Sequence, residues 1–170
     1  MSANIFIDLV QLDPSIETSL FNDSDYIDAM SNENWAQVAD MTLRKIGRRL
    51  ECEPLSINSH HWGGYYVIDT RTREFVGSCA YKDKPSPSGE VEIAYFTYPG
   101  FEGKGFATAM AAKLIDMAMA SPLVTTVIAH TLPEENASVA LLKKIGMKFG
   151  GEISDSDDGQ VWRWECAKCT

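Results

Sequence analysis

Short runs of apolar residues, bounded by turn-forming residues, recur along the chain and predict β-strands. Residues 4–12 alternate apolar side chains with others, which is the period of a strand that buries one face. Further strands are predicted at 62–69, 75–81, 90–98 and 124–131, with a C-terminal hairpin of 147–153 and 160–166. The three strands between residues 62 and 98 follow one another through short connections, so they are expected to form an antiparallel meander.

Apolar residues at helical spacing lie between these strands. The predicted helices are 34–50, 106–120 and one that opens at 133–136 and stops at Gly146. Residues 22–31 form a short helix at best, Asp13-Pro14 is expected to turn, and residues 55–61 are expected to form a loop.

The composition narrows the classes of function. The chain has 170 residues, 45% hydrophobic and 23% charged, which predicts a single domain over residues 1–170. No apolar run approaches the roughly 20 residues that cross a bilayer. The first 13 residues carry no basic segment, so a cytoplasmic protein without a membrane partner is expected. The net charge of −9, without a basic stripe, argues against nucleic-acid binding.

Metal and disulfide chemistry are not predicted. Four cysteines are too few and too scattered for a disulfide framework. Cys166 and Cys169 have C-x-x-C spacing, but no second pair completes the four ligands of a zinc site. The acidic turn at 154–159 lacks the glycine and the distal glutamate of a calcium loop.

A glycine-rich turn, Pro99-Gly100-Phe101-Glu102-Gly103-Lys104-Gly105-Phe106-Ala107-Thr108, connects the strand at 90–98 to the helix at 106–120. Because Gly103 and Gly105 lack Cβ, backbone N–H groups can point outward and an anion can approach closely. The helix start adds unpaired N–H groups and the positive end of the helix dipole, which favour phosphate. The alternative is a tight turn without a ligand. A dinucleotide-binding G-x-G-x-x-G fails, because position 108 is threonine and the turn follows a meander.

Two motifs resemble those of a known family. The first motif is similar to the Q/R-x-x-G-x-G/A loop that binds the pyrophosphate of acyl-CoA, and it reads here Glu102-Gly103-Lys104-Gly105-Phe106-Ala107. The second motif is the later helix, Asn136-Ala137-Ser138-Val139-Ala140-Leu141-Leu142-Lys143-Lys144-Ile145-Gly146-Met147. Together they resemble the GNAT superfamily of N-acyltransferases over roughly residues 62–166. Segments 91–95 and 129–133 resemble the branch that contains the ribosomal-protein N-terminal acetyltransferases. The resemblance implies an α/β (α+β) fold with a mixed, mostly antiparallel central sheet flanked by helices.

Three positions depart from the family pattern. Glu102 stands where Gln or Arg is usual and brings a negative charge to the phosphate site, which Lys104 can offset. Leu142 stands where many members carry a tyrosine that protonates the leaving thiolate, and Met147 replaces a frequent phenylalanine. Glu102 and Leu142 favour an alternative, a non-catalytic acyl-CoA-binding or interaction module of the same fold.

Acyl transfer from a thioester to an amine needs a proton acceptor for the ammonium, a donor for the tetrahedral oxyanion and a proton for the thiolate. The ammonium has a reference pKa of about 10.4 in an alkylamine and about 8 at an α-amino group. Glu92 is the candidate catalytic base; a surface carboxylate explains it equally, because the pattern does not fix which way the strand faces. Ser138 is the candidate donor to the thiolate, with plain helix capping as the alternative.

The resemblance implies acetyl-CoA as cosubstrate, bound at two regions. One is the strand at 90–98, which carries a bulge in the family and diverges from the strand at 124–131; backbone groups of Phe96, Thr97 and Tyr98 would meet the oxyanion and the pantetheine there. The other is the glycine turn with the last helix. The expected cofactor-binding residues are Phe96, Thr97, Tyr98, Gly103, Lys104, Gly105, Phe106, Ala107, Thr108, Asn136 and Ser138. Capping also explains Asn136 without a ligand.

Histidines and aromatic residues add weaker candidates. His130 ends a predicted strand, where a structural role is favoured over catalysis, although histidine titrates in the useful range. His60 and His61 lie in a predicted loop without an evident partner. Three aromatic residues either line an acceptor pocket or fill the core: Trp35, Trp62 and Tyr95.

The sequence therefore predicts an acetyl-CoA-dependent N-acetyltransferase that acts on a primary amine. Direct attack in a ternary complex is expected, because no cysteine lies where a covalent acyl carrier would be needed. The resemblance makes a protein N-terminal amine the first acceptor, followed by a small polyamine, an aminoglycoside or an amino acid. The protein is expected to act as a monomer or homodimer.

Overall fold

A seven-stranded sheet in the order β1-β2-β3-β4-β5-β7-β6 forms the centre of the protein. The structure is a computed structural model that describes residues 5–11, 14–34, 37–38, 40–42, 44–45, 62–156 and 158–168. The strands are β1 (Ile7–Gln11), β2 (Gly64–Asp69), β3 (Phe75–Tyr81), β4 (Glu90–Thr97), β5 (Thr126–Thr131), β6 (Lys148–Asp155) and β7 (Gly159–Ala167). Only β4 and β5 pair in parallel; every other pair of neighbours is antiparallel. The predicted mixed, mostly antiparallel sheet is confirmed.

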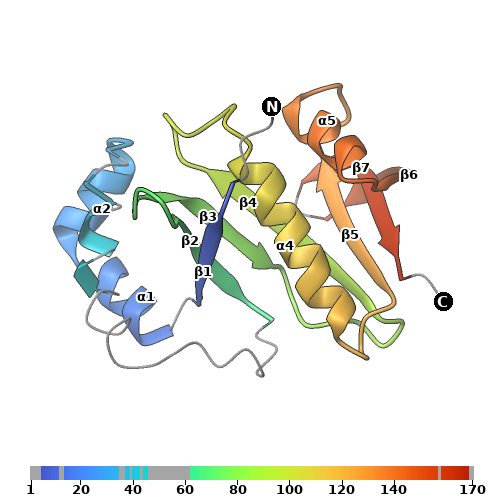
Figure 1. Cartoon of the computed structure of the whole chain (residues 1–170), viewed down its shortest axis with the longest axis horizontal. Coiled ribbons are helices and arrows are strands. Elements are labelled where there is room, and N and C mark those ends of the chain that lie inside the picture. The colour runs from blue at the N-terminus through green and yellow to red at the C-terminus, as the bar shows by residue number, and fades with distance from the viewer. Residues whose placement is uncertain are drawn as a thin grey trace.

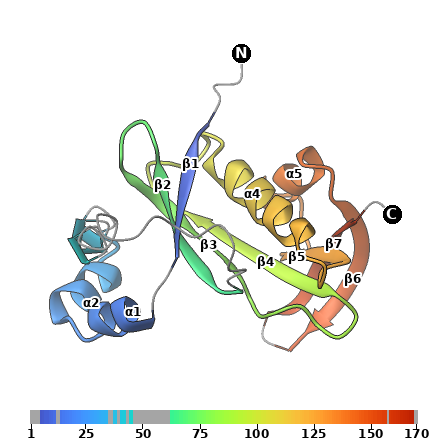
Figure 2. The same cartoon turned by 60° about the horizontal axis from the view of Figure 1, so that its bottom comes forward.

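Helices cover both faces of this sheet. The helices described from end to end are α1 (Pro14–Phe21), α2 (Ser24–Ser31), α4 (Phe106–Ala120) and α5 (Ala137–Lys144). Helix α4 crosses the middle of the sheet, with α5 beside β5, while α1 and α2 lie at the other end of the molecule (Figure 1). Figure 2 shows α1 and α2 on the opposite side of the sheet from α4.

The alternation of side chains along each strand supplies a separate core to each helical layer. Tyr65 and Val67 of β2 belong to the core that includes α4 and α5. Tyr66 and Ile68, which point to the other face, belong to the core that includes α1 and α2. The residues of β2 thus hold both layers onto one sheet, and this is why its burial is nearly continuous.

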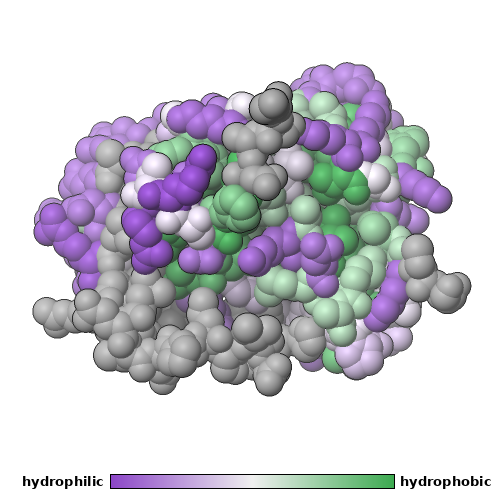
Figure 3. Space-filling view, in the orientation of Figure 1, coloured by the Kyte–Doolittle hydropathy of each residue, from purple (hydrophilic) through white to green (hydrophobic). Residues whose placement is uncertain are grey.

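The surface around α4 is mixed in polarity. In Figure 3 hydrophilic residues gather at the end formed by α1 and α2, and hydrophobic residues show among them around α4. Within the described ranges, no helix is long and apolar enough to cross a membrane. The cytoplasmic location stays a prediction.

Two of the helix predictions need correction. Helix α1 starts at Pro14, where a turn was predicted; proline suits the first helical position, because its missing N–H would have no helical partner there. The last helix begins at Ala137 and not within 133–136. Asn136 is extended (φ −146°, ψ −178°) and its side chain accepts from the Val139 N–H at 3.0 Å, which is the geometry of an N-cap.

The described part of the predicted helix at 34–50 is helical at residues 37–38, 40–42, 44 and 45. Val38 and Thr42 are each 1% exposed, in agreement with the predicted inner face. Arg44 pairs at the surface with Asp40 at 2.7 Å, as expected of a solvated face. Trp35, the loop at 55–61, His60 and His61 lie outside the described residues.

The predicted C-terminal hairpin is confirmed as β6 and β7. Trp162 and Trp164 share one face of β7, and the ring of Phe149 in β6 lies 5.6 Å from each of them, edge to face. This aromatic cluster packs the outer end of the sheet beside α5, where Lys143 lies 5.9 Å from the Trp164 ring.

Strands β3 and β4 approach so closely at Gly77 that the position has no room for a side chain. A Cβ there would lie 2.1 Å from Phe96 O and 2.8 Å from Met110 Cε. Gly77→Ala should therefore destabilise the fold by about 2 kcal/mol, a usual cost of overpacking, and lower Tm by roughly 4–8 °C for a chain of this length. Thermal denaturation beside Ser78→Ala, whose side chain lies on the other face of β3, measures this; equal melting temperatures would contradict it.

Candidate active site

Pairing between β4 and β5 stops in the centre of the sheet. The two strands pair at three positions, the last being Glu92 opposite Ile128. Both continue further, and beyond this point they line a cleft of about 300 Å³ together with Ser138 of α5. The predicted divergence of these strands is confirmed. The predicted bulge is not, because from Ile93 to Thr97 β4 stays in continuous register on β3.

The backbone of β4 turns alternate peptide groups toward this cleft. The Tyr98 N–H donates to Val76 O of β3 at 2.9 Å. Such bonds recur at every second residue of an antiparallel ladder, so the peptide groups of Phe96 are also directed to β3, while those of Tyr95 and Thr97 face the side of β5. This corrects the expectation for the backbones of Phe96 and Tyr98. The Tyr95 peptide group faces the cleft instead.

Side chains of the last residues of β4 alternate between a buried face and an exposed face of the sheet. The hydroxyl oxygen of Thr97 is buried and finds no hydrogen-bond partner among the residues described. Phe96, on the opposite face, is 47% exposed and packs edge to face with Tyr98. The peptide group of Thr97 therefore faces the side of β5, while its hydroxyl oxygen is enclosed by the protein.

Glu92 lies in the cleft, on the face of the sheet opposite α4, with its side chain 18% exposed. Its Oε1 is 2.6 Å from Lys82 Nζ and 3.1 Å from His130 Nδ1, and Lys82 Nζ is 3.8 Å from Asp158 Oδ2. Burial lowers the pKa of Lys82, but the contact with Glu92 and the charges of Glu92 and Asp158 outweigh it, so this pKa lies above its usual value. Lys82 is therefore a cation at neutral pH, held over the Glu92 carboxylate.

Ser138 approaches the cleft from the helical side. Because Asn136 caps α5, Ser138 is free of the capping role that was the alternative explanation for it. Burial raises the pKa of the Tyr95 phenol by more than its interaction with the Ser138 side chain lowers it, so the phenol stays protonated at neutral pH. The cleft thus has a carboxylate on one side and a pair of hydroxyls on the other.

The glycine turn leaves the start of α4 open. Gly103 (φ 70°) and Gly105 (φ 91°) both adopt the left-handed conformation, and Gly105 is the N-cap residue. No side chain in the described part of the protein caps α4, and its first turn contains no acidic residue. The peptide N–H groups of Phe106, Ala107 and Thr108 consequently keep the features of an anion site. Lys104 is exposed, with its Nζ 5.2 Å from the Phe101 ring, so it does not block the helix end.

Leu142 and Cys79 restrict the catalytic groups that are available in the cleft. Leu142 is fully buried in the core beneath α5, so this position presents no proton donor to the cleft. Cys79 of β3 is opposite Tyr95, and burial raises the pKa of its thiol to about 12, which makes it a poor nucleophile. Cys166 forms no disulfide with another described residue, and Cys52 and Cys169 lie outside the described residues. Over the described ranges, no cluster of His, Cys, Asp and Glu could hold a metal ion.

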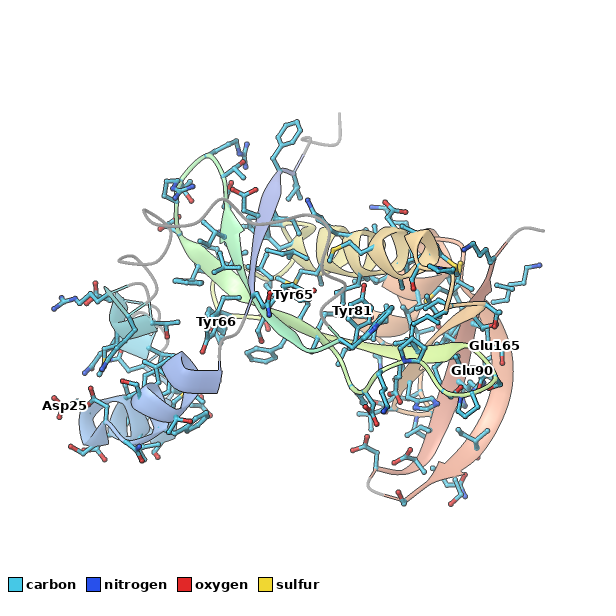
Figure 4. All side chains as sticks on the ribbon, turned by 90° about the horizontal axis from the view of Figure 1, so that it is seen from below. Asp25, Tyr65, Tyr66, Tyr81, Glu90 and Glu165 are labelled. Atoms are coloured by element: carbon cyan, nitrogen blue, oxygen red, sulfur yellow. The ribbon has the colours of Figure 1, made fainter. Side chains whose placement is uncertain are left out.

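Sequence reasoning missed Lys82, Asp158 and the contact between Tyr95 and Ser138. Opposite charges at Lys82 and in the acidic turn were visible, but their proximity depends on the strand order β4-β5-β7-β6, which no local pattern reveals. Figure 4 shows a second case: Glu90 and Glu165 lie together at the β6–β7 end, where Arg163 pairs with both.

Residues 7–148 match the family model described as an acetyltransferase (GNAT) domain. The chain belongs to this family. This GNAT protein is 30% identical over 91 residues to an uncharacterized N-acetyltransferase, p20, of Bacillus licheniformis; the match covers 54% of the chain and about half (51%) of that relative.

Solved structures show the same fold. RimL, a ribosomal L7/L12 alpha-N-protein acetyltransferase in complex with coenzyme A, superposes over 99% of this chain and 97% of its own with a TM-score of 0.64 and 12% identity. A ribosomal-protein-S5-alanine acetyltransferase from Vibrio fischeri covers 76% of this chain and 72% of its own, with a TM-score of 0.57 and 14% identity. The fold expected from the sequence is confirmed by these neighbours.

The turn offers a matched pair of glycines for testing anion binding. Gly100 (φ 89°) and Gly103 both have left-handed backbones, and a Cβ at either would meet no atom of the described residues within 4 Å. Alanine at each should cost similar strain, about 1 kcal/mol. Only Gly103→Ala, whose Cβ obstructs the approach to the helix N-terminus, should weaken coenzyme A binding, by at least about tenfold, or 1.4 kcal/mol. Calorimetric titration of both variants tests this; equal affinities would mean that the turn binds no diphosphate.

Proposed function

We propose that this GNAT protein transfers an acetyl group from acetyl-CoA to a primary amine by direct attack in a ternary complex. The observation that carries the proposal is the cleft between β4 and β5, with Glu92 and the Ser138–Tyr95 hydroxyls on its walls. Membership of the family supports acetyl transfer to an amine in general terms. The buried, unreactive Cys79 thiol favours direct attack over a covalent acyl-enzyme.

In this proposal acetyl-CoA occupies two regions. Its diphosphate is bound by N–H groups at Gly103 to Thr108, where the open helix end and the left-handed glycines favour an anion. Its pantetheine lies along β4, where the peptide groups of Tyr95 and Thr97 can pair with it as a further strand would. The same peptide groups are the candidate donors to the tetrahedral oxyanion.

The two walls of the cleft divide the proton chemistry. The Glu92 carboxylate attracts the acceptor ammonium and promotes loss of its proton. Ser138 and Tyr95, both protonated at neutral pH, supply the hydrogen bond or proton that the departing thiolate needs. Tyr95 thereby compensates for the leucine at position 142.

A protein N-terminal amine is the first candidate acceptor. The support is the superposition with RimL, named as an alpha-N-protein acetyltransferase, over nearly the whole of both chains. An α-amino group also has a reference pKa of about 8, which makes its deprotonation easier than that of an alkylamine.

A panel of acceptors with acetyl-CoA tests the activity directly. We expect mass spectrometry to find one added acetyl group on peptides with a free amino terminus and none on the same peptides with a blocked terminus. Acetylation of spermidine alone would move the proposal to a polyamine acceptor. Coenzyme A binding without turnover on any amine would instead support the non-catalytic module.

The role of Glu92 predicts a pH-dependent defect in Glu92→Gln. Removing the carboxylate removes its assistance to this proton transfer, and losing such assistance typically costs about 10²–10⁴ in rate, so kcat should fall at least about 100-fold at neutral pH. The defect should shrink as the pH rises above the pKa of the acceptor amine, because less deprotonation is then needed. Glu135→Gln, an exposed carboxylate that pairs with Lys143, is the control. A pH–rate profile of the same shape in wild type and Glu92→Gln would remove Glu92 from this role.

The hydroxyl pair can be tested without knowing the acceptor. If Ser138 and Tyr95 stabilise a thiolate, coenzyme A should bind more tightly as the pH rises, whereas acetyl-CoA, which has no thiol, should not. We expect Ser138→Ala and Tyr95→Phe to abolish this difference, and Tyr65→Phe, a buried phenol away from the cleft, to keep it. Calorimetric titration between about pH 7 and 9, around the reference pKa of about 8.5 for a thiol, measures it; an unchanged difference in both variants would exclude the pair.

A further inference from the structure

His130 is a buried histidine in the cleft, and its ring nitrogens make no aligned hydrogen bond to the described residues. It stands near the end of β5, and its side chain is 9% exposed. Neither ring nitrogen makes an aligned hydrogen bond to any residue that the structure describes, although Nδ1 lies 3.1 Å from Glu92 Oε1. A buried ring nitrogen without a partner costs folding free energy, so this arrangement points to a ligand or a reaction.

Glu92 is poorly placed to take a proton by itself. Its Oε1 lies 2.6 Å from the Lys82 ammonium, so this oxygen already has a cation as its partner. A general base works best when it titrates near the operating pH, which is the range of an imidazole and well above that of a carboxylate. The carboxylate next to His130 can orient the ring and stabilise its protonated form.

We propose that His130 is the catalytic base that accepts the acceptor's proton, with Glu92 as the group that positions the imidazole and stabilises the imidazolium. The inference rests on the proposed acetyl transfer and refines it. It gives a function to the 3.1 Å contact between His130 Nδ1 and Glu92 Oε1.

The ammonium nitrogen loses two protons in the proposed reaction. The ammonium gives one proton to His130, and the neutral amine attacks the thioester carbon, so that a C–N bond forms and the C–S bond breaks. The thiolate takes a proton from the Ser138–Tyr95 hydroxyls, and the second proton lost by nitrogen replaces it. The imidazolium releases its proton to solvent, leaving the amide, the thiol of coenzyme A and one H⁺.

Charged groups around His130 come from four elements. Glu92 comes from β4, Lys82 follows β3, and Asp158 lies in the β6–β7 turn. Arg163 of β7 is directly opposite His130, but it pairs with Glu90 and Glu165. Glu92 is thus the one of these charges in direct contact with the ring, and its removal should change the pH dependence most.

Two variants of His130 distinguish a base from a structural residue. His130→Gln keeps a polar side chain that cannot titrate, and His130→Ala leaves space that added imidazole can fill. The probes are acetyl-CoA with a short peptide that has a free, protonated amino terminus, and acetyl-CoA with hydroxylamine, which is already neutral at neutral pH.

With the peptide, we expect kcat to fall about 100-fold in both variants, in line with loss of a general base, while KM for acetyl-CoA is unchanged. The fall of the wild-type rate on the acid side should disappear in His130→Gln. With hydroxylamine as the acceptor, kcat of the variants should fall by less than about tenfold, because this amine needs no initial deprotonation. Added imidazole should restore turnover of the peptide by His130→Ala and not by His130→Gln.

Unchanged peptide turnover, or a higher KM for acetyl-CoA with an unchanged pH profile, would overturn the assignment and leave His130 as a structural or cofactor contact. Equal losses for peptide and hydroxylamine without imidazole rescue would overturn it too. If wild-type protein binds coenzyme A but acetylates no amine, the proposed function itself is wrong. If wild-type protein acetylates the peptide but the His130 variants behave as wild type, only the assignment of His130 is wrong. Thermal stabilisation by coenzyme A serves as the folding control in each variant.

Discussion

The parting of β4 from β5 after Glu92 is the constraint on which the site depends. A sheet normally pairs its strands along their length, because an unpaired peptide group in the interior is costly. Here β3 continues to hold one edge of β4 as far as Thr97, so the strand stays extended while its other edge faces a cleft. The exposed edge is thus rigid before any ligand arrives, which lowers the entropic cost of binding an extended chain along it.

Alternation along β4 then sorts the chemistry between the two faces of the sheet. Glu92 points away from α4 and meets His130 and Lys82, while Tyr95, three residues later, points to the helical side and meets Ser138. An odd spacing on a strand always separates side chains in this way. Glu92 and His130 therefore stand on one side of the sheet and the Tyr95 and Ser138 hydroxyls on the other.

Much of the fold could be predicted because its signals are local. Period-two alternation marked the strands, and the glycines at 103 and 105 marked the turn before α4. Helix α1 was not predicted, because eight residues that begin with a proline show little helical periodicity. The facing of Glu92 and the choice between the peptide groups of Phe96 and Thr97 depend on strand register, which a sequence leaves open. The meeting of Lys82 with Asp158 depends on β7 inserting between β5 and β6.

In the proposed function, Tyr95 of β4 takes the proton-donating role that Leu142 of α5 cannot fill. A donor at that point of α5 would have to leave the core, since Leu142 is wholly buried under the sheet. Tyr95 reaches the same side from β4 and is held there by β3 and by Ser138. Glu92 and Tyr95 share one strand, so a slip of β4 by a single residue would exchange their faces. The close contact at Gly77 opposes such a slip, because it admits no side chain between β3 and β4. The tight packing of these strands therefore fixes the faces on which Glu92 and Tyr95 lie.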